Sequence, residues 1–424
     1  MRRTGCYRGI YSLLGIFAVL FLAFSLFGCA KEKEETEEEQ EQVNLSLWTD
    51  RTTVALMEQL VEEFKSAHAG EADIKVTISE ESELSCKETV LANPKGAADI
   101  YTFADDQFEE LRRNGALLEI TQDAGDVIQD NGGGNNGAVL ASQKDGKLFA
   151  YPATAGNGYF LYYNSAYLSE TDIKSMDRIL AVAEKNKKKM MMDYSGGWYI
   201  YSFFKAAGLE VNVNEEGTQN TCDWNTKDKK YKGVDVARGM LSIAKRKGFQ
   251  NGSDEDFVKG VQDGSVIAGI NGAWNATKVE KAFGEHYAAA KLPTYTLAGD
   301  QVQMCSFAGY KLIGVNAHTK HPEWAMKLAR FLTNEENQKK RFDLTGECPS
   351  NIKAAASEQV QKSPAIAALA EQAKYASVQR VGDAFWTPTN VFGMVMADGN
   401  RDNKDLQGLL DKMVRGITAV PGGE

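Results

Sequence analysis

Several residue types and motifs are scarce in this chain of 424 residues, and each absence removes a class of function. The 4 histidines include no HExxH spacing, so a histidine-rich metal centre has little material. The 6 cysteines include no CxxC pair, which argues against a zinc ribbon or a thioredoxin-like site. Neither GxxxxGKS/T nor GxSxG occurs, so no ATPase phosphate loop and no hydrolase nucleophile elbow is visible. We therefore expect no metal, no cofactor and no catalytic residues.

The charge balance and the proline count also constrain the chain. Lys plus Arg number 48 against 58 for Asp plus Glu, and the net charge of -10 excludes nucleic acid as the natural partner. Residues 132–137 match GxGxxG, but no strand precedes them, so we predict a surface loop and no dinucleotide site. With 8 prolines and no Pro/Ser-rich linker, two lobes joined by chain crossovers fit better than separate domains.

The first forty residues carry an export pattern. Three arginines precede an apolar run over residues 10–27, which ends at Gly28-Cys29. This order predicts a signal peptide, although the run is long enough for a membrane-spanning helix to be an alternative. Residues 26–29 resemble the lipobox of bacterial lipoproteins, with Phe27 bulkier than usual there. We expect a signal peptide at 1–28, a lipidated Cys29 followed by an acidic tether to residue 42, and attachment to the outer face of the cytoplasmic membrane.

From residue 43 onward the hydrophobic pattern alternates between strands and helices. Strands are predicted at 43–47, 74–78 and 99–103, with helices at 57–64, 82–93 and 105–114 between and after them. Such an order indicates a parallel, doubly wound α/β sheet, in which ligands bind beyond the carboxyl ends of the strands. The residues of interest at those ends are Trp48, Asp50, Arg51, Glu80, Glu81, Phe103, Asp105 and Asp106.

The alternation restarts in the second half of the chain. Further strands are predicted at 159–164, 266–270, 288–292 and 311–315, and helices at 173–188, 322–332, 335–343, 357–376 and 406–418. Phe203 and Phe204 are expected in the core. Cys305 and Cys348 lie in late segments, so a bridge between them stays open.

Aromatic residues follow polar or glycine-rich junctions at Trp198, Trp274 and Trp386. Side chains at such junctions point into clefts more often than those inside an element. A flat ring offers an apolar surface to the C–H face of a sugar, while nearby carboxylates accept its hydroxyl groups. The combination of aromatic rings and acids predicts a carbohydrate ligand.

The order and spacing of several segments resemble the substrate-binding lipoproteins of ABC sugar importers, especially the maltose/maltodextrin-binding group. The resemblance covers about residues 43–420. The segments that carry it are Val43–Trp48, Ala98–Phe103, Gly146–Pro152, Gly158–Asn164, Asn271–Trp274, Lys311–Asn316 and Ala384–Trp386.

This resemblance implies a periplasmic-binding-protein-like fold, with two α/β lobes joined by a hinge and the ligand between them. Lobe 1 would comprise residues 43–153 and 293–333, and lobe 2 residues 154–292 and 334–420. The implied ligand-binding residues are Trp48, Asp50, Arg51, Glu80 or Glu81, Phe103, Asp106, Gln107, Asn157, Trp198 or Tyr199, Trp274 and Trp386. Arg51, Phe103, Ala273 and the Gly156-Asn157 pair depart from the maltose-binder pattern of lysine, tryptophan, proline and an acid, which leaves the sugar open.

We therefore expect a monomeric receptor that delivers malto-oligosaccharides or related oligosaccharides, unaltered, to a membrane permease driven by a separate ATPase. Two alternatives stay open. One is a receptor of the same fold for a non-sugar solute such as a polyamine. The other is a surface glycoside hydrolase that uses two carboxylates, for example Asp105 and Asp106 or Glu80 and Glu81.

Overall fold

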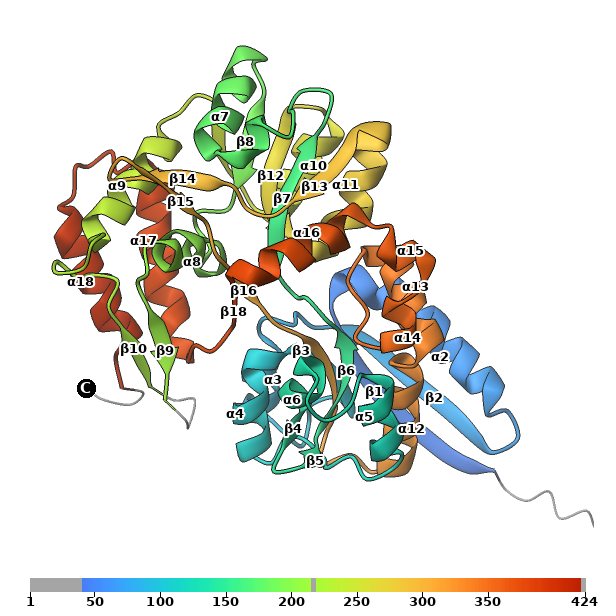
Figure 1. Cartoon of the computed structure of the whole chain (residues 1–424). Coiled ribbons are helices and arrows are strands. Elements are labelled where there is room, and N and C mark those ends of the chain that lie inside the picture. The colour runs from blue at the N-terminus through green and yellow to red at the C-terminus, as the bar shows by residue number, and fades with distance from the viewer. Residues whose placement is uncertain (1–39, 215–218, 421–424) are drawn as a thin grey trace, which may run out of the picture. The chain divides into compact units, whose positions relative to one another are not determined.

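The computed structural model describes residues 40–214 and 219–420 (Figure 1). The predicted signal peptide, Cys29 and most of the tether lie outside the described residues. Residues 40–42 and 70–73 belong to one small unit, and 43–69 and 74–420 belong to the unit that holds both sheets and every site discussed below. In the part of the chain that is described, no helix combines the length and the apolar character needed to cross a membrane.

The first lobe is built on a sheet with the strand order β2-β1-β3-β17-β6. Its strands are β1 (Glu41–Thr49), β2 (Ala72–Glu80), β3 (Ile100–Ala104), β6 (Ala150–Thr154) and β17 (Lys311–Val315). Strand β1 runs parallel to β3, while β17 runs antiparallel to both β3 and β6. All residues of the inner strands β3 and β17 and of the edge strand β6 are buried, as expected for strands covered on both faces.

Helices cover both faces of this sheet (Figure 1). Helix α12 packs against β17, β6 and α2, whereas α3 contacts β3 and α6 contacts β6. The bounds are α2 (Val54–Ala67), α3 (Cys86–Ala92), α4 (Phe108–Arg113), α5 (Ala124–Asp130), α6 (Gly137–Ser142) and α12 (Pro322–Leu332). Proline at the first position of α12 loses no helical hydrogen bond, which is why the predicted start of this helix is confirmed.

The second lobe is built on a sheet with the order β11-β8-β12-β7-β13. The strands are β7 (Tyr159–Asn164), β8 (Lys189–Met192), β11 (Phe249–Asn251), β12 (Val266–Gly272) and β13 (Tyr287–Ala290). Strand β8 is parallel to β11 and β12, and β7 is antiparallel to β12 and β13. The helices that contact this sheet are α7 (Met176–Lys185), α10 (Asp254–Gln262), α11 (Ala276–Phe283) and α16 (Pro364–Gln372).

A group of helices adds an aromatic-rich layer to the second lobe. It consists of α8 (Gly197–Ala206), α9 (Gly233–Ala244), α17 (Trp386–Ala397) and α18 (Leu406–Ile417), which contact one another. Phe203 and Phe204 are fully buried here, which confirms their predicted place in the core. The ring of Phe204 stacks on Trp224 with a centroid distance of 4.1 Å. This layer fixes the start of α8, where two of the predicted site residues lie.

The structure differs from the sequence prediction in the bounds of several helices and in the placement of one hairpin. The predicted helix 357–376 is broken into α15 (Glu358–Gln361) and α16, because Pro364 disfavours helical geometry in the residue before it. The hairpin of β14 (Thr294–Leu297) and β15 (Asp300–Gln303) contacts α7 and α9, so it lies with the second lobe and not, as predicted, with the first. Tyr295 and Leu297 are fully buried in the second-lobe core, which accounts for this placement. The remaining lobe boundaries stay a prediction.

The structure also bears on the cysteines and on the glycine-rich segment 132–137. Cys86, Cys222, Cys305 and Cys348 are all free thiols, so the bridge left open between Cys305 and Cys348 is not formed. Residues 132–136 lie between α5 and α6, Gly137 begins α6, and the side chain of Asn136 caps this helix. No strand enters this segment, which agrees with its interpretation as a loop.

Candidate functional site

The carboxyl ends of β1 and β2 meet, as the sequence predicts. The backbone N–H of Glu81 donates to the carbonyl of Thr49 over 3.0 Å, just beyond the two strands. Arg51 and Glu80 form an exposed ion pair at 3.5 Å. The carboxylate of Glu81 is half-buried and accepts hydrogen bonds from the hydroxyl groups at the start of α3. These contacts bring four predicted site residues, Asp50 to Arg51 and Glu80 to Glu81, to one edge of the sheet.

Two other predicted residues at this edge face inward. Gln107 is buried, donates to the carbonyl of Glu83 over 2.6 Å and accepts from the backbone of Lys87 at 3.0 Å. Its amide therefore holds the loop after β2 and has little capacity left for a ligand. Phe103 is 0% exposed and packs 5.9 Å from the ring of Tyr101 in the core. In this structure the ring of Phe103 presents no face to solvent.

Asp105 and Asp106 follow β3 directly and have few partners. One oxygen of Asp105 accepts from the backbone N–H of Tyr310 at 3.0 Å, and the other lies 3.8 Å from Arg380. Burial raises the pKa of Asp105 to about 6, against the lowering effect of Tyr310 and Arg380. Burial and then the neighbouring Asp105 carboxylate raise the pKa of Asp106 to about 7. Oδ2 of Asp105 and Oδ1 of Asp106 have no hydrogen-bond partner in the described residues, so this pair keeps free acceptor capacity.

Lys311, at the start of β17, is a buried cation that pairs with two further acids. Its ammonium lies 2.7 Å from Glu83 and 2.6 Å from Glu347. Burial lowers the pKa of Lys311, but the two carboxylates outweigh it and the net pKa is raised. The same ammonium lies 5.6 Å from the ring centroid of Trp274, within the range of a cation–π contact. Lys311 thus connects the first-lobe charges to a predicted aromatic residue.

The start of α8 carries Trp198 and Tyr199. Trp198 is half-buried, its ring lies 5.2 Å from Phe307, and its indole N–H has no partner among the described residues. Tyr199 is 5% exposed, and its hydroxyl group donates to Asp254 over 2.9 Å. Burial, and then the Asp254 carboxylate, raise the pKa of Tyr199 well above its usual value. The two side chains therefore differ: Trp198 has a free donor, and Tyr199 is committed to an acid.

Trp274 follows β12 in a short 3-10 turn, Ala273–Asn275. Its indole N–H donates to Oδ2 of Asp254 over 2.6 Å, and its ring folds back over Gly272. A Cβ atom at Gly272 would lie 2.1 Å from this ring, so glycine is required for the ring to take this position. The packing of the Trp274 ring therefore explains why glycine stands at position 272 in the Asn271–Trp274 segment.

The remaining predicted residues are also placed by the fold. Asn157 lies between β6 and β7, donates its backbone N–H to the carbonyl of Gly309 over 2.8 Å, and has a side-chain oxygen without a partner among the described residues. Trp386 is the first residue of α17, with its ring 5.0 Å from Phe385. Both side chains are half-buried.

The burial of the six tryptophans separates two groups. Trp224 is 0% exposed and Trp324 is 7% exposed, and neither is a predicted site residue. The other four are half-buried and are all predicted site residues: Trp48, Trp198, Trp274 and Trp386. Partial burial is common for tryptophan, but each of these four rings keeps apolar surface that a ligand can cover.

Sequence reasoning missed Asp254, Lys311, Arg380 and Lys87 as members of the site. Asp254 lies in a Ser253-x-x-Asp256 capping box, a pattern that indicates only the start of a helix. Lys87 is buried and pairs with Glu110 at 2.9 Å and with Asp383, three residues before Trp386. The partners of these charged residues lie far along the chain, so no local pattern could indicate them.

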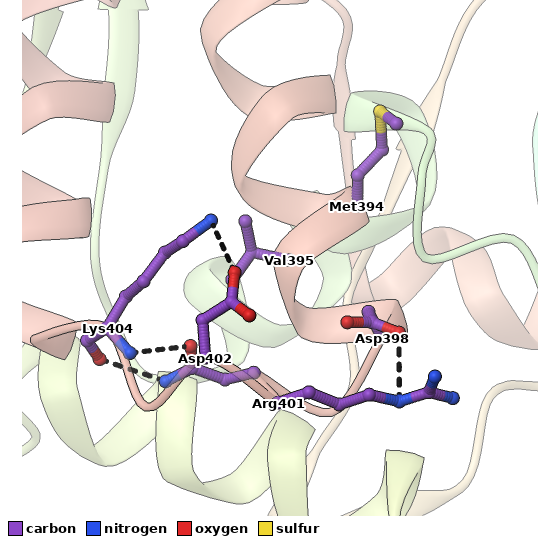
Figure 2. Close-up of a pocket in the computed structure, with 7 residues that line it drawn as sticks. Met394, Val395, Asp398, Arg401, Asp402 and Lys404 are labelled. Carbon is purple, nitrogen blue, oxygen red and sulfur yellow. Dashed lines mark hydrogen bonds and ion pairs between the residues drawn. The ribbon is translucent and has the colours of Figure 1, made fainter.

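A surface pocket of about 150 Å³ at the end of α17 lies apart from these residues (Figure 2). It is lined by Met394, Val395, Asp398, Asn400, Arg401, Asp402 and Lys404. Its charges pair with one another, Arg401 with Asp398 at 3.1 Å and Lys404 with Asp402 at 3.3 Å, and no ring lines it. It lacks the features of a sugar site. Within residues 40–214 and 219–420 no group of three or more His, Cys, Asp or Glu side chains is placed to hold a metal ion.

Comparison with known proteins gives consistent matches. The galactooligosaccharide-binding protein of Bacillus subtilis is 24% identical over 90% of this chain and 91% of its own length. A maltooligosaccharide ABC transporter solute-binding lipoprotein of Streptococcus pneumoniae is 24% identical over 69% of this chain and 70% of its own. The solved structure of maltodextrin-binding protein MalE1 from L. casei BL23, without ligand, has a TM-score of 0.70 and 26% identity, and covers 89% of this chain and 100% of that one.

The profile of one family matches residues 59–368, which is most of the chain. This match agrees with the two-lobed α/β architecture and with the order of the segments described above. The chain belongs to the family of bacterial extracellular solute-binding proteins.

Proposed function

We propose that this protein captures an oligosaccharide between its two lobes and delivers it, unaltered, to the permease of an ABC importer. The observation that carries this proposal is the partial burial of Trp48, Trp198, Trp274 and Trp386, together with carboxylates that keep free acceptor capacity. Indole rings stack against the apolar faces of pyranose rings, while carboxylate oxygens accept hydrogen bonds from sugar hydroxyls. Neither group alone would satisfy so amphipathic a ligand.

Within this site we assign the first lobe a polar role. Asp105 and Asp106 have unpartnered oxygens, and a sugar hydroxyl can both donate to a carboxylate and accept from a carboxylic acid. Their raised pKa values therefore do not prevent binding near neutral pH. Glu81, Asp50 and Arg51 extend the polar surface along the ends of β1 and β2. Phe103 and Gln107 would act by supporting these residues and not by touching the sugar.

The ligand class we propose is a malto-oligosaccharide or a related oligosaccharide. Two of the similar proteins described above are named for maltooligosaccharide or maltodextrin binding, and one for galactooligosaccharide binding. All three names agree on a chain of several sugar rings. The half-buried tryptophans on separate elements suit such a chain, because each ring of the ligand could meet a different indole.

We further propose that the receptor is held at the membrane by lipid on Cys29 and works beside a permease with a separate ATPase. The support is the lipobox-like segment at 26–29 and the name of the pneumococcal relative, an ABC transporter lipoprotein. Substitution Cys29→Ser should release the protein from the membrane fraction of the producing bacterium. Retention of the Cys29→Ser protein in that fraction would instead favour the membrane-spanning alternative.

The first test of the ligand is calorimetric. Full-length protein, purified in a detergent without a sugar headgroup, is titrated with maltotriose, longer maltodextrins, galacto-oligosaccharides, xylo-oligosaccharides and spermidine. Saturable heat with one oligosaccharide class, matched by a shift in tryptophan fluorescence, is the expected result. Binding heat with spermidine alone would favour a polyamine receptor. No binding heat with any of these compounds would overturn the proposal. Chromatography of the recovered sugar should show it intact, whereas shortened chains would indicate a hydrolase.

A further inference from the structure

Three hydrogen bonds from three different segments converge on the carboxylate of Asp254. The hydroxyl of Tyr199 and the side-chain amide of Asn271 donate to Oδ1, each over 2.9 Å. The indole N–H of Trp274 donates to Oδ2 over 2.6 Å. These donors lie on α8, at the end of β12 and in the turn after it, whereas Asp254 begins α10. One side chain therefore links α8, β12 and α10 of the second lobe, and Figure 1 shows these three elements as ribbons.

The position of Asp254 is fixed by its own helix. Ser253 caps α10, accepting from the backbone N–H of Asp256 at 3.2 Å, and Asp256 in turn accepts from the backbone N–H of Ser253 at 3.0 Å. A capping box of this kind defines where the first helical residue lies. A carboxylate in the first turn is also favoured by the positive end of the helix dipole. The helix start therefore fixes the position of the Asp254 carboxylate, which accepts from Tyr199, Asn271 and Trp274.

The two rings bound to Asp254 are both predicted ligand residues. The Tyr199 hydroxyl would be a buried donor without a partner if the carboxylate were absent, which is unfavourable. Trp274 is held at its indole edge by Asp254, while Gly272 leaves room for its ring. Hydrogen bonds to a charged acceptor are about twice as strong as neutral ones, so these rings have a preferred orientation before any ligand arrives.

Asp254 also orders the turn that carries Trp274. The Asn271 amide that donates to Asp254 turns its oxygen toward Asn275 and toward the backbone N–H of Gly272, at 2.7 and 2.9 Å. The carbonyl of Gly272 accepts from the hydroxyl of Tyr162 at 2.9 Å. The backbone that presents the Trp274 ring is thus connected to Asp254 through Asn271.

From this geometry we infer that Asp254 is the positioning residue of the sugar site, orienting Tyr199 and Trp274 so that both rings are ready to contact one oligosaccharide. The inference rests on the proposed function. Because its Oδ1 already accepts two donors and its Oδ2 one, Asp254 acts through the rings and not as a main contact of the sugar. Orientation before binding lowers the entropy cost of forming the complex.

The first measurement needs no ligand. Full-length protein is labelled with ¹⁵N at the tryptophan indoles, and substitution Trp274→Phe identifies the signal of Trp274. In Asp254→Asn, whose side-chain amide cannot accept at both positions, that signal should move upfield and broaden, while the other indole signals stay. The matched control is Glu255→Gln, which removes the same charge from an exposed neighbour on α10 and should leave every indole signal in place. An unmoved Trp274 signal in Asp254→Asn would overturn the inference.

The second measurement is a double-substitution cycle on the affinity for the oligosaccharide found above. Asp254→Asn should raise the Kd at least tenfold, Trp274→Phe should also raise it, and the pair should exceed the larger single effect by no more than about twofold. Additive effects would mean that Asp254 contacts the sugar independently, and an unchanged Kd would mean that it has no role; either result overturns the inference. If Asp254→Asn unfolds, Tyr199→Phe replaces it in the cycle with Trp274→Phe, because Tyr199→Phe removes one of the three donors to Asp254 and leaves the carboxylate in place.

The two hypotheses fail in different ways. If the unsubstituted protein binds no oligosaccharide, the proposed function is wrong and this role of Asp254 falls with it. If the unsubstituted protein binds and Asp254→Asn binds equally well, the receptor function stands and only the positioning role is wrong.

Discussion

The two lobes hold their carboxylates in opposite ways. In the first lobe, Asp105 and Asp106 are packed together with unpartnered oxygens, and burial raises the pKa of each carboxyl group. In the second lobe, both carboxylate oxygens of Asp254 are occupied, because they accept from three donors. An acid with free acceptor capacity can meet a ligand, whereas an acid whose oxygens are occupied can only organise its neighbours. On our proposals, carboxylates of the first lobe would contact the ligand, whereas Asp254 in the second lobe would orient the aromatic rings that contact it.

Lys311 connects the buried acids Glu83 and Glu347 to the ring of Trp274, and its loss should have the largest effect. Lys311→Met would leave Glu83 and Glu347 buried without their cation, at a cost of about 3–5 kcal/mol of unfolding free energy. Urea denaturation followed by circular dichroism measures this loss. Lys362→Met is the control, because its pair with Glu358 is exposed and should contribute less than about 1 kcal/mol. A Lys311→Met protein as stable as the control would show that the buried acids are neutral without the lysine.

Trp274→Ala tests the ring that Asp254 holds in the second lobe. Loss of the ring removes the stacking surface and should weaken oligosaccharide binding by about thirtyfold, or about 2 kcal/mol. Titration calorimetry with the sugar identified above gives the change in Kd. Trp324→Phe is the control, because Trp324 is buried against Phe64 on the first lobe and should alter stability more than affinity. Equal binding by Trp274→Ala would remove this ring from the site.

The acidic side of the comparison is tested by pH. Because the pKa of Asp106 rises from 3.8 to about 7 on folding, the folded protein keeps a proton between these values that the unfolded chain releases. Unfolding free energy should therefore fall as the pH rises through this window, with a slope of at most about 1.4 kcal/mol per pH unit for one proton. Asp106→Asn should flatten the slope but not abolish it, since Asp105 titrates in the same direction. Urea denaturation at several pH values measures both slopes, with Glu255→Gln as the control. A slope equal to that of the unsubstituted protein would contradict the prediction.

Much of the fold could be predicted because its signals are local. The bounds of α12 and β17 match the predicted ranges, since a proline start and an unbroken apolar strand are visible within a few residues. The convergence of the β1 and β2 ends follows from the strand-helix-strand order. The four half-buried tryptophans were also among the predicted site residues, because each follows a strand end, a glycine-rich junction or a polar turn.

The parts that could not be predicted depend on distant partners. Phe103 is predicted as a site residue because it ends a strand and because the family resemblance implies a stacking ring there, but alternation alone does not say which face of β3 is covered more deeply. Asp254 meets Tyr199 from 55 positions away and Trp274 from 20, and its sequence context indicates only a helix start. Side-chain roles set by such tertiary contacts are outside the reach of a local pattern.

The smallest effect separates two neighbouring acids at the end of β2. Glu80 is exposed and pairs with the exposed Arg51, so Glu80→Gln should change unfolding free energy by less than about 0.5 kcal/mol and the sugar Kd by less than about twofold. Glu81 is half-buried and held by the hydroxyls of Ser85 and Thr89, so its carboxylate has a fixed direction and Glu81→Gln should weaken binding more. Calorimetry on both variants decides between them. A larger loss of affinity in Glu80→Gln would mean that the first lobe recognises the sugar with the more exposed of these two acids, and the contrast between free and occupied carboxylates would then not extend to this edge.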